Sequence, residues 1–161
     1  MEMNFYAVFV AALSTLVVGS VWYGPLFGKI WMKETGLTEE VLKKDSMVKI
    51  FSLTYIFSVM IALVMQLLTI HQFGALGMVG GPDFVASARP SYAAFMADYS
   101  IAFRTFQHGA LHGFMSGLFL AFPLLAINGL FERKSWKLIF IHSGYWTVVM
   151  TIMGAIVCGW V

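Results

Sequence analysis

Four long apolar stretches separated by charged connectors limit most strongly what this chain can fold into. They run approximately over residues 5–22, 50–70, 106–130 and 138–160, and each lacks Asp, Glu, Lys and Arg. About 20 apolar residues in a helix span the hydrocarbon core of a bilayer. Only 11% of the residues are charged and 60% are hydrophobic, whereas a soluble domain carries about 25% charged residues. We therefore expect an all-α, polytopic membrane protein.

Basic residues are concentrated in two of the three connectors between these stretches. The eight that lie there are Lys29, Lys33, Lys43, Lys44, Lys49, Arg133, Lys134 and Lys137. The connector over residues 71–105 carries only Arg89 and Arg104. We expect one domain over residues 1–161. Because lysine and arginine mark cytoplasmic loops, its four transmembrane helices would form an antiparallel bundle with both termini outside.

Aromatic residues lie at the ends of the spans that face the basic connectors. Those expected to anchor the protein at this interface are Trp22, Tyr23, Phe27, Trp31 and Trp136. Gly24 and Pro25 follow the first stretch and should interrupt its helix, because proline lacks a backbone N–H. The segment that follows, including Trp31, is predicted to lie along the membrane surface.

Small residues four apart mark the helix faces on which two backbones can approach closely. Three stretches contain them: Ala11, Thr15 and Gly19 in the first, Gly109, Gly113 and Gly117 in the third, and Thr147, Thr151 and Ala155 in the fourth. We expect the third and fourth stretches to pack on each other. The first stretch is then the candidate contact with a second subunit.

Three histidines are expected at the outer ends of the spans. His108 and His112 are four residues apart, so both rings project from one helical face, and His71 ends the second stretch. With Asp83 or Asp98 from the outer connector, they form a candidate site for a divalent metal ion. The same spacing also suits imidazoles that only hydrogen-bond a neighbouring helix or water.

The outer connector and the remaining polar residues give further expectations. The connector opens with several glycines, which predicts an irregular segment, and Ser91 is a candidate cap for a helix extending to Tyr99. Glu2 is a further carboxylate on the outer side. Gln66 and Asn128 are predicted to form hydrogen bonds between helices.

The sequence contains no nucleophile elbow, phosphate loop, dinucleotide fingerprint or zinc-protease motif, so it gives no support for an enzyme. Topology already explains the basic residues, and we expect no nucleic-acid partner. The leading hypothesis is a structural or interaction module in the lipid bilayer that forms a small homo-oligomer or binds another membrane protein. The alternative is a small-solute or metal-ion permease or binding protein that uses the outer histidines.

A run of aromatic, glycine and proline residues also carries a family resemblance. The residues concerned are Asn4, the run Gly-Ser-Val-Trp-Tyr-Gly-Pro-Leu-Phe-Gly-Lys-Ile-Trp over residues 19–31, Phe131-Glu132-Arg133 and Tyr145. In these positions the chain resembles the bacterial integral-membrane family called domain of unknown function 1761. The resemblance implies a four-helix, multi-pass protein of the bacterial inner membrane and brings no established activity, ligand or catalytic residue.

Overall fold

The computed structural model describes residues 3–44 and 46–161, and all the regular elements in these residues are helical. Four helical segments are long and apolar enough to span a membrane: Phe5–Leu26, Met47–Thr69, Phe106–Phe131 and Trp136–Gly159. They coincide with the four stretches expected from the sequence, with ends that differ by a few residues. The expected all-α fold with four candidate spans is confirmed.

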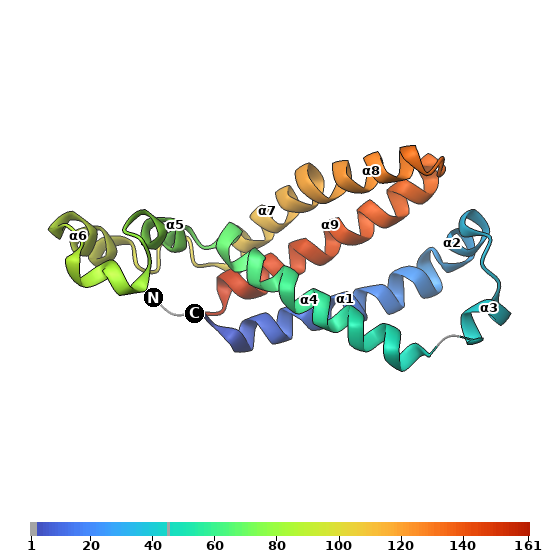
Figure 1. Cartoon of the computed structure of the whole chain (residues 1–161), viewed down its shortest axis with the longest axis horizontal. Coiled ribbons are helices and arrows are strands. Elements are labelled where there is room, and N and C mark those ends of the chain that lie inside the picture. The colour runs from blue at the N-terminus through green and yellow to red at the C-terminus, as the bar shows by residue number, and fades with distance from the viewer. Residues whose placement is uncertain (1–2, 45) are drawn as a thin grey trace.

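The helices form two pairs that meet along α9 (Figure 1). In chain order the elements are α1 (Phe5–Val21), η1 (Trp22–Leu26), α2 (Gly28–Thr35), α3 (Glu39–Lys44), α4 (Met47–Thr69), α5 (His71–Met78), η2 (Pro82–Ser87), α6 (Pro90–Tyr99), α7 (Phe106–Ser116), η3 (Gly117–Ala121), α8 (Phe122–Phe131) and α9 (Trp136–Gly159). The continuous helix formed by α7, η3 and α8 runs beside α9, and α4 crosses α1. The start of α1 and the end of α9 lie near α5, whereas α2, α3 and the turn from α8 to α9 lie at the opposite end (Figure 1).

Polar side chains begin the four long helices. Asn4 Oδ1 accepts the Ala7 backbone N–H at 3.0 Å, and Ser46 Oγ accepts that of Lys49 at 3.4 Å. Thr105 and Ser135 do the same at the starts of α7 and α9, each at 3.1 Å. Since the first N–H groups of a helix have no partner within it, these caps fix where each span begins.

The first span is interrupted where Gly24 and Pro25 predict a break. The backbone forms a π-helical turn over Trp22–Leu26, with Gly24 at φ −97° and ψ −107°. The Phe27 N–H donates to the Trp22 carbonyl at 2.9 Å, after which α2 starts at Gly28. A Cβ at Gly28 would lie only 2.6 Å from the Tyr23 carbonyl oxygen. Glycine is therefore required for α2 to fold back onto this turn.

The core lies between α1, α4 and α9. Its buried apolar residues are Val8, Ala11, Ala62, Met65, Tyr145, Val149, Met153 and Val157. Ala11 and Thr15 are 0% and 1% exposed within the single chain. The expectation that the small residues of the first span face a second subunit is therefore wrong. They face α4 and α9, because these helices bring enough side-chain volume to cover them.

The helix α7 packs on α9 through glycines, as the sequence predicts for the third and fourth stretches. A Cβ at Gly117 would lie 2.5 Å from the Thr147 Cα atom, and one at Gly113 would be 2.8 Å from the Thr151 Cα atom. Gly109 lies against Gly154 and Cys158. Gly154 and Cys158 do not belong to the predicted stripe of small residues. Because α7 crosses α9 at an angle, the contact residues on α9 do not follow a strict spacing of four.

The outer connector is more regular than the sequence suggests. Its opening is helical through Gly74 and Gly77, and the break falls at Gly80 and Gly81, whose φ angles are 94° and 103°. Burial of one face of α5 outweighs the low helix propensity of glycine. Ser91 does not cap α6, which starts at Pro90 because proline presets the φ angle of a first helical residue.

Candidate metal centre

His71, His108 and His112 lie together at the end of the bundle where α1 begins and α9 ends. One ring nitrogen from each lies within 4.8 Å of the other two. The Nε2 atoms of His71 and His108 are 2.9 Å apart and share a hydrogen bond. The ring centroids of His71 and His112 are 5.0 Å apart, and those of His108 and His112 are 4.5 Å apart. The three imidazoles therefore form one compact group.

Local backbone structure brings these histidines together from two segments. The helix α4 ends at Thr69, and Ile70 is extended, with φ −106° and ψ 101°. His71 then opens α5 in a new direction. On the other side, the Thr105 side chain caps α7 just before His108, and the next turn of that helix presents His112 on the same face.

The loop before α7 is held by contacts with three elements, α5, α9 and α7. Gln72 Nε2 donates to the carbonyl oxygens of Tyr99 and Ala102, at 2.7 and 2.9 Å. Arg104 Nε donates to the Cys158 carbonyl at 2.8 Å, near the end of α9. Phe103 has a positive φ of 62°, and its ring centroid lies 5.2 Å from that of His108. These contacts fix the loop that joins the two histidine-bearing segments.

The group offers three imidazole nitrogen ligands and access from outside. His71 is exposed, and His108 and His112 are half-buried. A tetrahedral zinc ion with Zn–N bonds of about 2.0–2.1 Å separates its ligand nitrogens by about 3.4 Å. The ring nitrogens here lie within 4.8 Å of one another, so binding would require the rings to adjust toward that spacing. Three protein ligands leave a fourth position for water, and imidazole suits Zn²⁺ and Cu²⁺.

The structure does not bring the predicted carboxylates into this group. Asp83 lies in η2 and Asp98 in α6, and neither belongs to the set of mutually close ligand atoms. Glu2 lies outside the described residues. His142 is at the other end of the bundle, where its Nδ1 and the Tyr23 hydroxyl are 2.8 Å apart. His142 lies in the first third of α9, so the rise of that helix separates it from the histidines at the end where α9 finishes.

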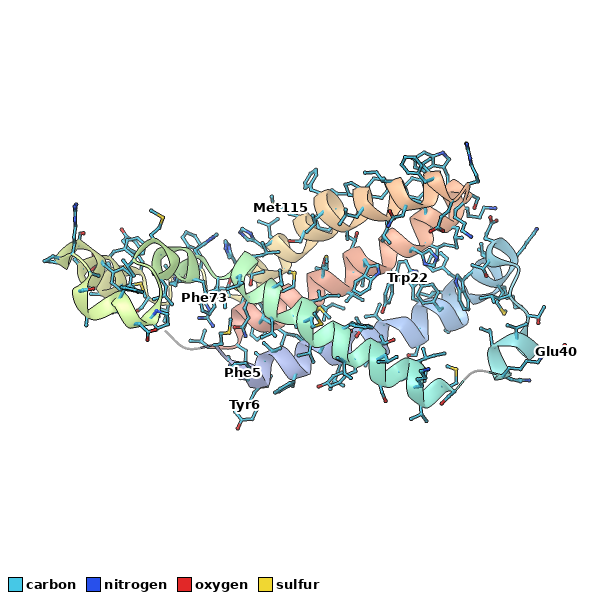
Figure 2. All side chains as sticks on the ribbon, viewed as in Figure 1. Phe5, Tyr6, Trp22, Glu40, Phe73 and Met115 are labelled. Carbon is cyan, nitrogen blue, oxygen red and sulfur yellow. The ribbon has the colours of Figure 1, made fainter. Side chains whose placement is uncertain are left out.

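The aromatic residues expected at the interface have contacts of their own. Trp22 points between α1 and α9 (Figure 2), and its Nε1 donates to the Ile141 carbonyl at 3.0 Å. Its ring centroid lies 4.8 Å from that of Phe27. Tyr23 packs edge-on against Trp31, with ring centroids 5.3 Å apart. Trp136 is 54% exposed at the start of α9.

Sequence reasoning missed the residues that support the histidines. Gln72 follows His71 directly, and a polar residue that ends a long apolar stretch was the available signal. In the sequence, Arg104 stands out only as one of two basic residues in the outer connector. Cys158 is buried, and its thiol lies 3.4 Å from the Thr69 carbonyl oxygen. None of these contacts has a sequence spacing that predicts it, because each joins positions far apart in the chain.

Four apolar helices of spanning length, with a cluster of imidazoles at one end, define the class as a multi-pass α-helical membrane protein. The chain belongs to the family described as protein of unknown function (DUF1761), whose model matches residues 6–158. This match confirms the family that the resemblance indicated. A search of curated proteins and a search of solved structures each gave no match.

Proposed function

We propose that this protein binds a divalent transition-metal ion, zinc or copper, through His71, His108 and His112. The observation that carries the proposal is that one nitrogen from each ring lies within 4.8 Å of the other two. Two of the histidines come from one helix, and the third comes from a separate segment 37 residues earlier. Such convergence supports a binding site better than the four-residue spacing alone.

The hydrogen bonds of the cluster also support metal binding. His71 and His108 bond to each other, but the His112 ring has no hydrogen-bond partner among residues 3–44 and 46–161. The alternative, in which the imidazoles only hydrogen-bond a neighbouring helix or water, leaves water as the partner of the half-buried His112 ring, and a metal ion can displace that water. A bound metal ion would take a lone pair from all three rings.

Isothermal titration calorimetry with Zn²⁺ on the detergent-purified protein tests this proposal. We expect one ion per chain, with binding weakened at least about a hundredfold in His112→Ala and His108→Ala, since each removes one of three ligands. Gln107→Ala, an exposed neighbour on the same helix, is the matched control and should bind like the wild type. No binding by the wild-type protein would contradict the proposal.

A second set of variants tests the ligand set. Asp83→Asn and Asp98→Asn should leave the zinc affinity unchanged, because both carboxylates lie outside the histidine group. A tenfold loss in either variant would show that the outer connector closes over the ion and supplies a fourth ligand.

The proposed location is the inner membrane of a bacterium, with the termini and the histidine cluster on the outer side. The excess of basic residues at the opposite end supports this orientation. In a background lacking Cys158, we expect Ser91→Cys to react with an impermeant maleimide in intact cells. Lys43→Cys should react only after lysis. Labelling of both positions in intact cells would rule out this topology.

An interaction module that forms a small oligomer is the second proposal. In the most apolar part of α4, 11% of the residues are buried, against 39% in the corresponding part of α9. The outward face of α4 includes Phe57, Met60 and Val64, all more than half exposed. We propose that a second copy of the chain packs there, in which case light scattering in detergent should give the mass of a dimer. A monomeric mass in both detergent and nanodiscs would contradict it.

A further inference from the structure

A cavity with polar side chains lies at the end of the bundle opposite the histidines, where α8 turns into α9. Its volume is about 210 Å³. Four polar side chains line it together with apolar ones: Asn128, Glu132, Lys134 and His142 beside Leu125, Leu138 and Ile139. Polar groups of both charges thus converge at the end of two spans whose other surfaces are apolar.

The turn between the helices shapes this cavity. The backbone reverses at Arg133, which has a positive φ of 58°, and the Lys134 N–H donates to the Gly129 carbonyl at 2.8 Å. A Cβ at Gly129 would lie 2.7 Å from the Ile139 side chain. This glycine lets α8 and α9 pack closely next to the turn. Glu132 and Lys134 flank Arg133, where the backbone reverses.

The charges in the cavity are available to a ligand. Within residues 3–44 and 46–161, neither Glu132 nor Lys134 takes part in an ion pair, although both line the same small volume. His142 lines the cavity, and the hydrogen bond between its Nδ1 atom and the Tyr23 hydroxyl fixes the orientation of its ring. Its Nε2 atom has no partner in the same residues and can bond to a ligand.

We propose that this cavity binds a zwitterionic phosphoethanolamine group, supplied by the headgroup of a phosphatidylethanolamine lipid. Lys134 and His142 would hold the phosphate, and Glu132 and Asn128 would hold the ammonium group. The carboxylate discriminates against purely anionic lipids, which would place two negative charges side by side. The headgroups of the surrounding bilayer lie at the ends of the spans, and the half-buried Leu125 adds apolar surface to the lining of the cavity.

Native mass spectrometry of the delipidated protein in detergent tests this assignment. The probes are phosphatidylethanolamine, phosphatidylglycerol and phosphatidylcholine with the same acyl chains. We expect about tenfold more retention of phosphatidylethanolamine than of the other two, since only it pairs a phosphate with an ammonium that can donate hydrogen bonds. Glu132→Gln and Lys134→Met should each lower that retention about tenfold.

Glu39→Gln and Lys43→Met are matched controls, because they change the same charges on α3, where the two side chains lie 3.9 Å apart. They should retain lipid like the wild type, and circular dichroism verifies that every variant is folded. Equal retention of the three lipids, or an unchanged profile in Glu132→Gln and Lys134→Met, would overturn the proposal. Displacement of the lipid by an equimolar amount of soluble phosphoethanolamine would overturn the lipid as the source and identify a free solute. Zinc binding at the other end is independent of all these outcomes.

Discussion

The two helix pairs of this protein are held together in different ways. Between α7 and α9, glycines bring backbone against backbone, and an added Cβ at Gly109 or Gly113 would overlap the carbonyl groups of Gly154 and Met150. Between α1 and α4, side chains make the contact. The hydroxyls of Thr15 and Ser58 lie 2.7 Å apart, and the Tyr55 hydroxyl donates to the Phe9 carbonyl at 3.2 Å.

This difference follows from the solvent of a membrane protein. Lipid chains are as apolar as leucine, so burial of apolar surface does not drive one spanning helix onto another. Close van der Waals contact and hydrogen bonds remain as the attractive forces. The α7–α9 pair depends on close van der Waals contact, and the α1–α4 pair depends on hydrogen bonds. We therefore expect the α7–α9 pair to be the less tolerant of added volume.

Substitution of Gly113 should have the largest effect. Gly113→Leu has no space on α9, and we expect loss of the folded state, while Gly113→Ala should destabilise it by about 1–3 kcal/mol. Gly74→Ala is the control, because nothing lies within 4 Å of a Cβ there, and it should stabilise α5 by up to about 1 kcal/mol. Thermal unfolding measures both. Equal effects at the two glycines would show that close contact with α9 is not what makes Gly113 sensitive to added volume.

Zinc should stabilise the protein by joining the two pairs. His71 follows α4, and His108 lies on α7, so a bound ion ties one pair to the other. At a free concentration one hundred times its dissociation constant, a ligand specific for the folded state adds about 2.7 kcal/mol. We expect the unfolding temperature to rise with zinc in the wild type and to stay constant in His112→Ala. A rise in both would place the stabilising ion elsewhere.

Loss of the hydroxyl contact between α1 and α4 should have a smaller effect. Ser58→Ala removes the bond to Thr15 and should cost about 0.6 kcal/mol, the average for hydrogen bonds between spanning helices. Ser14→Ala is the matched control. The Ser14 oxygen is buried without a hydrogen-bond partner among the described residues, so its removal should be neutral or stabilising. Chemical unfolding in detergent distinguishes the two, and a larger loss in Ser14→Ala would contradict the assignment.

The smallest effect concerns Glu34, which connects α2 to the start of α9. It accepts a hydrogen bond from the Ser135 hydroxyl at 2.5 Å and lies 3.5 Å from Lys137. That hydrogen bond, assisted by the lysine charge, holds the pKa of Glu34 below its usual value. Since the pKa of Glu34 is lower in the folded state than in the unfolded state, this contact stabilises the folded protein at pH values above the usual pKa range of glutamate.

The stabilisation from Glu34 should be lost as the pH falls from that range through the lowered pKa. Glu34→Gln should unfold at the same temperature as the wild type in acid and at a slightly lower temperature near neutral pH. An identical difference at every pH would mean that the contribution is not electrostatic. Unfolding scans between acid and neutral pH provide the measurement.

Much of the candidate site could be predicted because it depends on regular spacing. The pair His108 and His112 follows from the helical repeat, and His71 follows from the length of the second span. The carboxylates could not be placed, since Asp83 and Asp98 depend on how η2 and α6 fold outside the bundle. The same reason hid Gln72, whose partners lie about 30 residues away in sequence.

The sequence by itself determined the number of spans and their approximate ends. The reason is that an apolar helix must match the thickness of the bilayer wherever it packs. Only the tertiary structure decided which faces meet: the small residues of α1 proved to be internal, and Gly154 rather than a regular stripe met Gly109. Small residues permit close approach on any side, so the angle at which two helices cross selects the ones that touch.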